Sequence, residues 1–216
     1  MLIAGIDEAG RGPCLGPMVL AVTLIDKENE EALIQIGVKD SKLLSKEERE
    51  RQFPLIQGAV IENHCIHISP QEIDELMDKI SLNEIEAMLA GKLLNSLTQK
   101  PDVVYVDSPD IVMAEFANRI KKYISFPVKI ISEHKADVNY PIVSAASIIA
   151  KVERDNAIKK IASSFGEIGS GYSHDDVTIN FLKKYLLEHN MLPEFARKSW
   201  ATTKVLHNER FQTRLY

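Results

Sequence analysis

An acidic pair between a strand-like stretch and a glycine-rich turn constrains this chain more than any other feature. Residues 2–6 are apolar and predict a β-strand, Asp7 and Glu8 follow at its end, and residues 10–17 are rich in Gly and Pro. Neighbouring strand residues point to opposite faces. One of the two carboxylates would therefore face the apolar interior unless the strand bends or a metal ion holds it.

The glycine-rich turn does not match the common phosphate-binding loops. A dinucleotide-binding loop has the spacing G-x-G-x-x-G before a helix, but here the third glycine, Gly16, comes one position late. Pro13 also lacks an N–H that could bind phosphate, and the chain contains no G-K-[ST] sequence. What remains is a flexible backbone that can approach a ligand closely beside two acidic residues.

The hydrophobic pattern predicts an α/β fold, a five-stranded mixed sheet flanked by helices. The expected strands are residues 2–6, 18–25, 59–68, 103–107 and 127–131. Capping boxes predict three helix starts, at Ser45 with Glu48, Ser69 with Glu72, and Ser81 with Glu84. Further helices are expected after Pro109 to about residue 123, over 142–161 and over 174–189, with a loop at 133–141.

We find no repeat or linker, so residues 1–216 are expected to form a single catalytic domain. A helical C-terminal segment, about 174–216, is expected to pack on it, with only short helix after Pro193. Two cysteines are too few for a disulfide framework, and Cys14 is expected to be a buried hydrophobic residue. The longest uncharged run, 12–25, contains two prolines and is too short to cross a bilayer. We therefore expect a cytoplasmic protein without a membrane partner.

The charge is unevenly distributed along the chain. The net charge is -5, but residues 1–120 carry 11 Lys+Arg against 21 Asp+Glu, whereas residues 121–216 carry 15 against 10. Such a distribution can place a basic surface beside an acidic centre and is compatible with a nucleic-acid partner. It is equally compatible with charges that only solvate helix surfaces.

Acidic residues follow several of the predicted strands. Asp107 ends one strand, and Asp137 comes shortly after another. Ligands of such sheets collect beyond the strand ends, so these carboxylates could meet Asp7 and Glu8 in one site. Clustered carboxylates favour hard cations such as Mg²⁺ or Mn²⁺, and two such ions can support phosphodiester hydrolysis. The alternative for each aspartate alone is a turn or a helix cap.

The sequence resembles the ribonuclease HII family, most closely its archaeal branch. The family's first motif is present as Gly5-Ile6-Asp7-Glu8-Ala9-Gly10-Arg11-Gly12-Pro13, and Gly16-Pro17 completes it. Further family-like segments follow in order across nearly the whole chain: 38–44, 105–109, 133–137, 144–151, 169–172 and 197–200.

This resemblance implies a ribonuclease H-like fold and an endonuclease. It would cleave the RNA strand of RNA/DNA hybrids and single ribonucleotides in duplex DNA, leaving 3′-hydroxyl and 5′-phosphate ends. The family's metal-binding and catalytic carboxylates match Asp7, Glu8, Asp107 and Asp137, which would hold two Mg²⁺ or Mn²⁺ ions when substrate is bound. The loop that reads the ribose 2′-hydroxyl matches Gly10, Arg11 and Gly12. Tyr172 matches a tyrosine that packs on the next deoxyribose.

Four other residues are candidates for substrate phosphate contacts: Lys39, Lys42, Ser147 and Lys151. The alternatives are solvated lysines and a serine that caps or packs. His134 and His174 lie near these segments, and ordinary surface or capping roles are the alternative to catalysis.

Two rival functions have different signatures. A hybrid-binding module without catalysis would bind without Mg²⁺ and cut nothing, whereas a sugar kinase of the broader ribonuclease H-like group would show two related halves. We expect a monomer. The tail, Gln212 to Tyr216, has Gln212 and Leu215 spaced as in peptides that dock on sliding clamps, but it lacks the closing aromatic pair. A frayed terminus is the alternative.

Overall fold

The computed structural model describes residues 1–38 and 44–212, with side chains to residue 209. Its contacts divide the chain into two compact units. The first unit comprises Met1–Ala9, Val19–His67 and Ser81–Glu153. The second comprises Gly10–Met18, Ile68–Ile80 and Arg154–Tyr216, so the C-terminal segment expected from about residue 174 belongs to it.

A five-stranded mixed sheet forms the centre of the first unit and confirms the predicted fold class. Its strands are β1 (Leu2–Ala9), β2 (Met18–Asp26), β3 (Glu62–Ile68), β4 (Val103–Asp107) and β5 (Lys129–Glu133). They lie in the order β3-β2-β1-β4-β5. β1 pairs antiparallel with β2 and parallel with β4, which in turn pairs parallel with β5.

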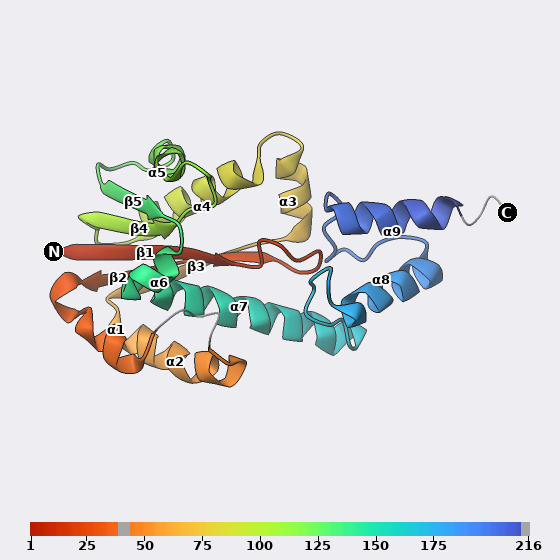
Figure 1. The fold of residues 1–216 in the computed structure, drawn as a ribbon, viewed down its shortest axis with the longest axis horizontal. Coiled ribbons are helices and arrows are strands. Elements are labelled where there is room, and N and C mark those ends of the chain that lie inside the picture. The colour runs from red at the N-terminus through yellow and green to blue at the C-terminus, as the bar shows by residue number, and fades with distance from the viewer. Residues whose placement is uncertain (39–43, 213–216) are drawn as a thin grey trace. The chain divides into compact units, whose positions relative to one another are not determined.

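Helices cover both faces of this sheet. The first unit contains the helices α1 (Glu31–Ile36), α2 (Lys46–Ala59), α4 (Leu82–Ser96), α5 (Met113–Lys121) and α6 (Ala136–Asn139), and the 3₁₀ turn η1 (Lys27–Asn29). The long helix α7 (Pro141–Phe165) begins in the first unit and ends in the second. α4 and α5 lie on one face of the sheet, and α1, α2 and the start of α7 lie on the other (Figure 1).

A close approach at Gly5 brings the start of α7 onto the sheet. A Cβ at Gly5 would lie 2.3 Å from the carbonyl oxygen of Ile142, so only glycine fits there. The hydroxyl of Thr23 donates to the same carbonyl oxygen at 2.9 Å. Residues 142–152 of α7 then bury their apolar side chains in the core shared with β1 and β2. The start of α7 is therefore packed closely against β1, the strand that carries the acidic pair.

The second unit has an apolar core of its own. Its remaining helices are α3 (Pro70–Met77), α8 (Asp176–His189) and α9 (Ala201–Gln212). Cys14 is fully buried in a cluster with Leu15, Leu182 and Leu186, which confirms it as a buried residue.

The three predicted helix starts are confirmed. The side chains of Ser45, Ser69 and Ser81 each accept a hydrogen bond from the backbone N–H three residues later. At Ser69 the capping box is complete, because the Glu72 side chain also bonds back to the Ser69 backbone.

Several boundaries differ from the sequence prediction. β1 continues through the acidic pair to Ala9 instead of ending at Ile6, because residues 7–9 pair with residues 19–21 of β2. β3 starts at Glu62, because α2 continues to Ala59. α6 occupies part of the expected loop, and α9 is longer than the short helix expected after Pro193.

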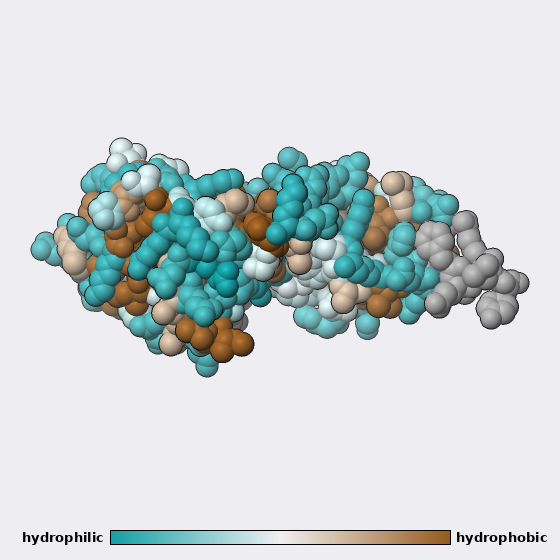
Figure 2. Space-filling view, turned by 90° about the horizontal axis from the view of Figure 1, so that it is seen from above, coloured by the Kyte–Doolittle hydropathy of each residue, from teal (hydrophilic) through white to brown (hydrophobic). Residues whose placement is uncertain are grey.

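Within the described residues, no helix is long and apolar enough to cross a membrane. The face shown in Figure 2 is mostly hydrophilic, with hydrophobic residues in small separate groups.

Candidate active site

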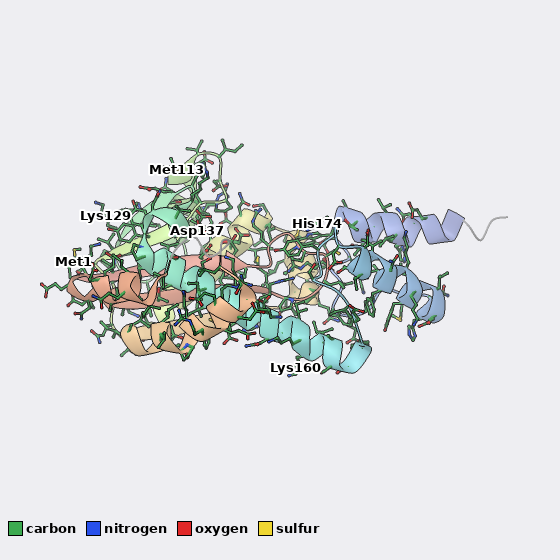
Figure 3. The ribbon with its side chains drawn as sticks, turned by 60° about the horizontal axis from the view of Figure 1, so that its bottom comes forward. Met1, Met113, Lys129, Asp137, Lys160 and His174 are labelled. Carbon is green, nitrogen blue, oxygen red and sulfur yellow. The ribbon has the colours of Figure 1, made fainter. Side chains whose placement is uncertain are left out.

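Three of the four predicted carboxylates lie on neighbouring strands of the sheet. Asp7 and Glu8 are in β1, and Ile6 pairs with Val106 of β4, which places Asp107 beside the acidic pair. Asp137 lies on α6, which follows β5 and contacts β4 (Figure 3). The parallel pairing of β1 with β4 thus brings together residues that are 100 positions apart.

Asp7 is buried among polar partners. Its side chain is 5% exposed, and its Oδ1 accepts a hydrogen bond from the N–H of Glu8 at 2.8 Å. Burial raises the pKa of Asp7, although the charge of Lys151 and a hydrogen bond from Ser147 oppose that effect. Lys151 also donates to the Ser147 hydroxyl at 2.5 Å. The structure therefore places both predicted phosphate contacts against Asp7, and their role toward substrate stays a prediction.

Burial and neighbouring negative charges also act on Glu8. Loss of hydration raises the pKa of Glu8 well above its usual value, and the nearby charges of Asp7, Glu86 and Asp107 raise it further. Glu86, on α4, is 2% exposed and was not singled out from the sequence. The sequence signal that could have found it is its spacing, because Glu86 follows Leu82 by four residues and precedes Leu89 by three, on the apolar face of the helix.

A strained backbone position holds Asp107 next to α6. Lys135 has a left-handed conformation, with φ of 58°, which is uncommon for a residue with a side chain. The following N–H, that of Ala136, donates to Oδ1 of Asp107 at 2.9 Å. Asp137 comes next and is 1% exposed. This turn thus fixes the two aspartates relative to each other.

The donor set suits hard divalent cations, because it consists of carboxylate oxygens whose mutual repulsion a cation would relieve. Among the described residues, however, no group of three or more His, Cys, Asp or Glu side chains is arranged to hold a metal ion. Asp7 and Asp107 instead accept hydrogen bonds from the backbone. The role of the four carboxylates as metal ligands stays a prediction.

The glycine loop lies in the second unit, where it meets the turn of Tyr172. A Cβ at Gly12 would lie 3.7 Å from the Tyr172 ring. Gly10 has φ of 83°, and a Cβ there would lie 2.4 Å from the Arg154 side chain. The guanidinium of Arg154 in turn lies 5.4 Å from the centre of the Tyr172 ring. Arg154 thus contacts both predicted recognition elements.

One carbonyl joins these two elements. The N–H groups of Cys14 and Leu15 both donate to the carbonyl oxygen of Gly171, at 2.8 and 3.2 Å. Asp175 holds the same turn, because its carboxylate accepts from both the N–H and the hydroxyl of Ser170. Those hydrogen bonds lower the pKa of Asp175 to about 2.

The remaining sequence candidates have separate outcomes. Lys39 and Lys42 lie outside the described residues. His134 bonds through Nε2 to the carbonyl oxygen of Asp110 at 2.8 Å, which ties its own segment to the loop after β4. The ring of His174 lies 5.3 Å from that of Tyr172.

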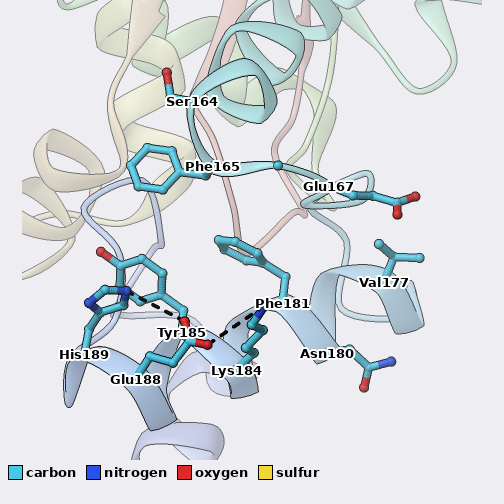
Figure 4. Close-up of a pocket in the computed structure, with 11 residues that line it drawn as sticks. Ser164, Phe165, Glu167, Val177, Asn180, Phe181, Lys184, Tyr185, Glu188 and His189 are labelled. Carbon is cyan, nitrogen blue, oxygen red and sulfur yellow. Dashed lines mark ion pairs between the residues drawn. The ribbon is translucent and has the colours of Figure 1, made fainter.

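A cavity of about 790 Å³ lies in the second unit between the end of α7 and α8 (Figure 4). Phe165, Phe181, Tyr185 and His189 form much of its wall. No predicted catalytic or substrate-binding residue within the described part of the chain lines it. It is therefore separate from the candidate active site.

Comparison with known proteins decides the family. The ribonuclease HII family model matches residues 4–203. Ribonuclease HII of Thermococcus onnurineus is 46% identical over 97% of this chain and 91% of the relative. Ribonuclease HII of Methanococcus maripaludis strain S2 is 47% identical over 100% of this chain and 90% of the relative. This chain belongs to the ribonuclease HII family. It is a type HII ribonuclease H, an endonuclease whose family identity supports activity on RNA/DNA hybrids.

Solved ribonuclease HII structures share its fold. Ribonuclease H2 of Pyrococcus horikoshii has a TM-score of 0.92 at 44% identity, covering 98% of this chain and 99% of that one. The ribonuclease HII chain solved with PCNA from Archaeoglobus fulgidus has a TM-score of 0.85 at 36% identity, covering 93% and 95%. A ribonuclease HIII solved with Mn²⁺ shares the fold at 20% identity, with a TM-score of 0.83 over 98% of this chain and 71% of that one.

Proposed function

We propose that this ribonuclease HII hydrolyses phosphodiester bonds on the RNA side of RNA/DNA hybrids and at single ribonucleotides in duplex DNA. The products would be 3′-hydroxyl and 5′-phosphate ends. One observation carries the proposal: in a chain of this family, Asp7, Glu8 and Asp107 lie within electrostatic range of one another on adjacent strands. Such a cluster of charges suits chemistry on a phosphate only if cations are recruited with it.

The four carboxylates are the proposed ligands of Mg²⁺ or Mn²⁺. When bound, these cations would supply activation of water and stabilisation of the leaving 3′-oxygen. The chain's own residues hold the carboxylates in place. Ser147 and Lys151 orient Asp7, and the N–H of Ala136 orients Asp107. The positive charge of Lys151 opposes the effect of burial on the pKa of Asp7.

The second unit supplies the proposed recognition of ribose. Locally, only the 2′-hydroxyl distinguishes RNA from DNA, so recognition needs polar atoms close to it. The backbone of Gly10, Arg11 and Gly12 can provide them, since glycine allows close approach. The ring of Tyr172, next to Gly12, would pack on the neighbouring deoxyribose.

A cleavage assay tests the proposed function. A labelled duplex with one ribonucleotide is incubated with Mg²⁺, with Mn²⁺ and with EDTA, beside an all-DNA duplex of the same sequence. We expect a single cut at the ribonucleotide with either metal and none in EDTA or in the all-DNA duplex. A phosphatase-sensitive 5′ end identifies the product chemistry. Binding without any cut, in any of the metals, would instead favour the non-catalytic hybrid-binding module.

A sliding clamp is a second proposed partner. The relative from Archaeoglobus fulgidus was solved in complex with PCNA. The clamp-like spacing of Gln212 and Leu215 falls on side chains outside the described part of the chain. Titrating a peptide of residues 205–216 against a purified clamp tests this proposal. A Leu215→Ala peptide is the control, and equal affinity of both peptides would contradict the predicted docking.

A further inference from the structure

A buried arginine from the C-terminal part of the chain organises the glycine loop. Arg197 is 0% exposed, and its guanidinium hydrogen bonds in the described structure all end on backbone carbonyl oxygens. Nη2 donates to Gly10 at 2.5 Å and to Gly16 at 3.0 Å, and Nε donates to Gly16 at 3.1 Å. Nη1 donates to Arg11 at 3.0 Å. One side chain thus binds both ends of the loop.

Burying this charge is costly, which argues against a role as simple filler. An apolar side chain could occupy the space without losing the hydration of a guanidinium. Burial, and then the nearby charge of Arg154, lower the pKa of Arg197 to about 10. The group is therefore still protonated at neutral pH and keeps all of its donors. What the charge provides is a fixed set of donors for the loop carbonyls.

The segment that carries Arg197 is itself anchored. The ring of Trp200 lies 4.8 Å from the Arg197 guanidinium, and its Nε1 donates to the carbonyl oxygen of Gly12 at 3.0 Å. The backbone N–H groups of Lys198 and Ser199 donate to the carboxylate of Asp74 on α3. Arg197 and Trp200 together bind three consecutive carbonyls, those of residues 10, 11 and 12.

Because peptide groups are planar, the hydrogen bonds to the loop carbonyls also fix the direction of the N–H groups that follow them. In a trans peptide, the C=O of one residue and the N–H of the next point in opposite directions. The described structure contains no cis peptide. Fixing the carbonyls of Gly10 and Arg11 toward the buried guanidinium therefore turns the N–H groups of Arg11 and Gly12 away from it. Gly12 is also the loop residue beside the Tyr172 ring.

We propose that Arg197 is the positioning residue for ribose recognition in this enzyme, with Trp200 as its helper. By holding the carbonyls of Gly10 and Arg11, it orients the N–H groups of Arg11 and Gly12 as donors to the ribose 2′-hydroxyl. It thereby sets the preference for a ribonucleotide over a deoxyribonucleotide. This inference rests on the proposed reading of the 2′-hydroxyl by the glycine loop.

The test compares the affinity for a one-ribonucleotide duplex with that for an all-DNA duplex, by fluorescence anisotropy in EDTA. Arg197→Lys keeps the charge but loses the forked donor geometry. We expect its preference for the ribonucleotide to fall about five- to tenfold, the value of one or two weakened hydrogen bonds. Its affinity for all-DNA duplex should stay unchanged, whereas a merely structural defect would lower both affinities together.

Two further variants keep the test decisive. Thr203→Val is the matched control, because the Thr203 hydroxyl donates to the carbonyl oxygens of Arg197 and Trp200 without touching the loop. It should lower thermal stability and leave the ribose preference intact. Trp200→Phe keeps a ring there and removes only the donor to Gly12, so it carries the test if Arg197→Lys does not fold.

The outcomes separate the two ideas. If folded Arg197→Lys keeps the wild-type preference for the ribonucleotide, the proposed role of Arg197 is wrong, but the proposed function stands. If Arg197→Lys does not fold, the same conclusion follows when Trp200→Phe keeps that preference. A wild-type chain with no ribose preference overturns the proposed reading of the 2′-hydroxyl and the inference with it.

Discussion

The acidic end of the sheet gathers negative charges, whereas the glycine loop surrounds a single buried positive charge. Around Asp7 and Glu8, several carboxylates are gathered, and burial, followed by their mutual repulsion, raises the pKa of Glu8. Around Arg197, a buried positive charge is surrounded by carbonyl oxygens that accept its hydrogen bonds. Under the proposed function the first region would be stabilised by an added cation, whereas the guanidinium of Arg197 already has hydrogen-bond acceptors within the protein. The proposed catalysis would therefore depend on bound cations, whereas the proposed recognition would depend on hydrogen bonds that the folded chain already makes.

The largest effect is expected at the acidic end. Asp7→Asn removes a charge of the proposed metal site while keeping the shape of the side chain. Cleavage of a one-ribonucleotide duplex should fall by about 10³-fold or more, because the cations would no longer be held for chemistry. Steady-state rates measure the loss, and circular dichroism checks the fold. Glu115→Gln, an exposed residue of α5, is the control and should keep full activity. Retained turnover in Asp7→Asn would remove Asp7 from the mechanism.

The second largest effect is expected on protein stability, from a substitution in the glycine loop. Gly10→Ala would force a left-handed alanine against Arg154, with the new Cβ 2.4 Å from that side chain. We expect a loss of about 2–4 kcal/mol in the free energy of unfolding, from backbone strain and overpacking together. Urea denaturation measures it. Gly58→Ala, in helix α2 with nothing within 4 Å of the new Cβ, should instead stabilise by about 0.5–1 kcal/mol. Equal stability of the two variants would contradict the strained loop.

A smaller effect of opposite sign is expected at Glu8. Since loss of hydration and neighbouring carboxylates raise the pKa of Glu8, its charged form opposes folding at neutral pH. Glu8→Gln should therefore raise the stability of the metal-free protein by about 1 kcal/mol while cleavage is lost. Thermal unfolding in EDTA and an activity assay provide the two readings. An unchanged or lower melting temperature would mean that Glu8 is not under repulsion.

The smallest effect depends on pH and concerns the Tyr172 turn. Hydrogen bonds from Ser170 lower the pKa of Asp175 to about 2, below the ordinary value of 3.8. A lowered carboxyl pKa stabilises the fold above the ordinary value, and that contribution disappears as the pH falls through the folded value. The difference in melting temperature between wild type and Asp175→Asn should thus be full above about pH 4 and vanish toward pH 2. A difference that does not change with pH would contradict this expectation.

Local sequence signals predicted much of the fold. The strand Val103–Asp107 has the predicted bounds, since its branched residues stop at the Ser-Pro that follows. The helix starts at the three serines were predicted correctly, because each capping hydrogen bond joins residues only three positions apart. α6 was missed, because it begins after Lys135 in a left-handed conformation rather than at a capping side chain. The extent of β1 was wrong because pairing with β2 overrides the local turn signal.

Sequence reasoning reached the candidate site through motifs, and it named Ser147 and Lys151, but it did not reach Glu86 or the contacts of Arg197. Asp7, Glu8 and Asp107 stood out because charges interrupt or end apolar strands, and the sheet brings them together as expected. Glu86 did not stand out, because a single glutamate in a helix is ordinarily a surface residue. The contact of Arg197 with Gly10 joins residues 187 positions apart, and only the folded chain specifies such a contact.

The contact between Arg197 and Gly10 has a consequence for folding during synthesis of the chain. Synthesis proceeds from the amino terminus, so the glycine loop is made before Arg197, which follows Gly10 by 187 positions, and before Trp200. A nascent chain halted before residue 197 would already carry every acidic residue of the proposed site. It would still lack the side chains that fix the loop, so the proposed selection of substrate would become possible only once Arg197 and Trp200 have been made.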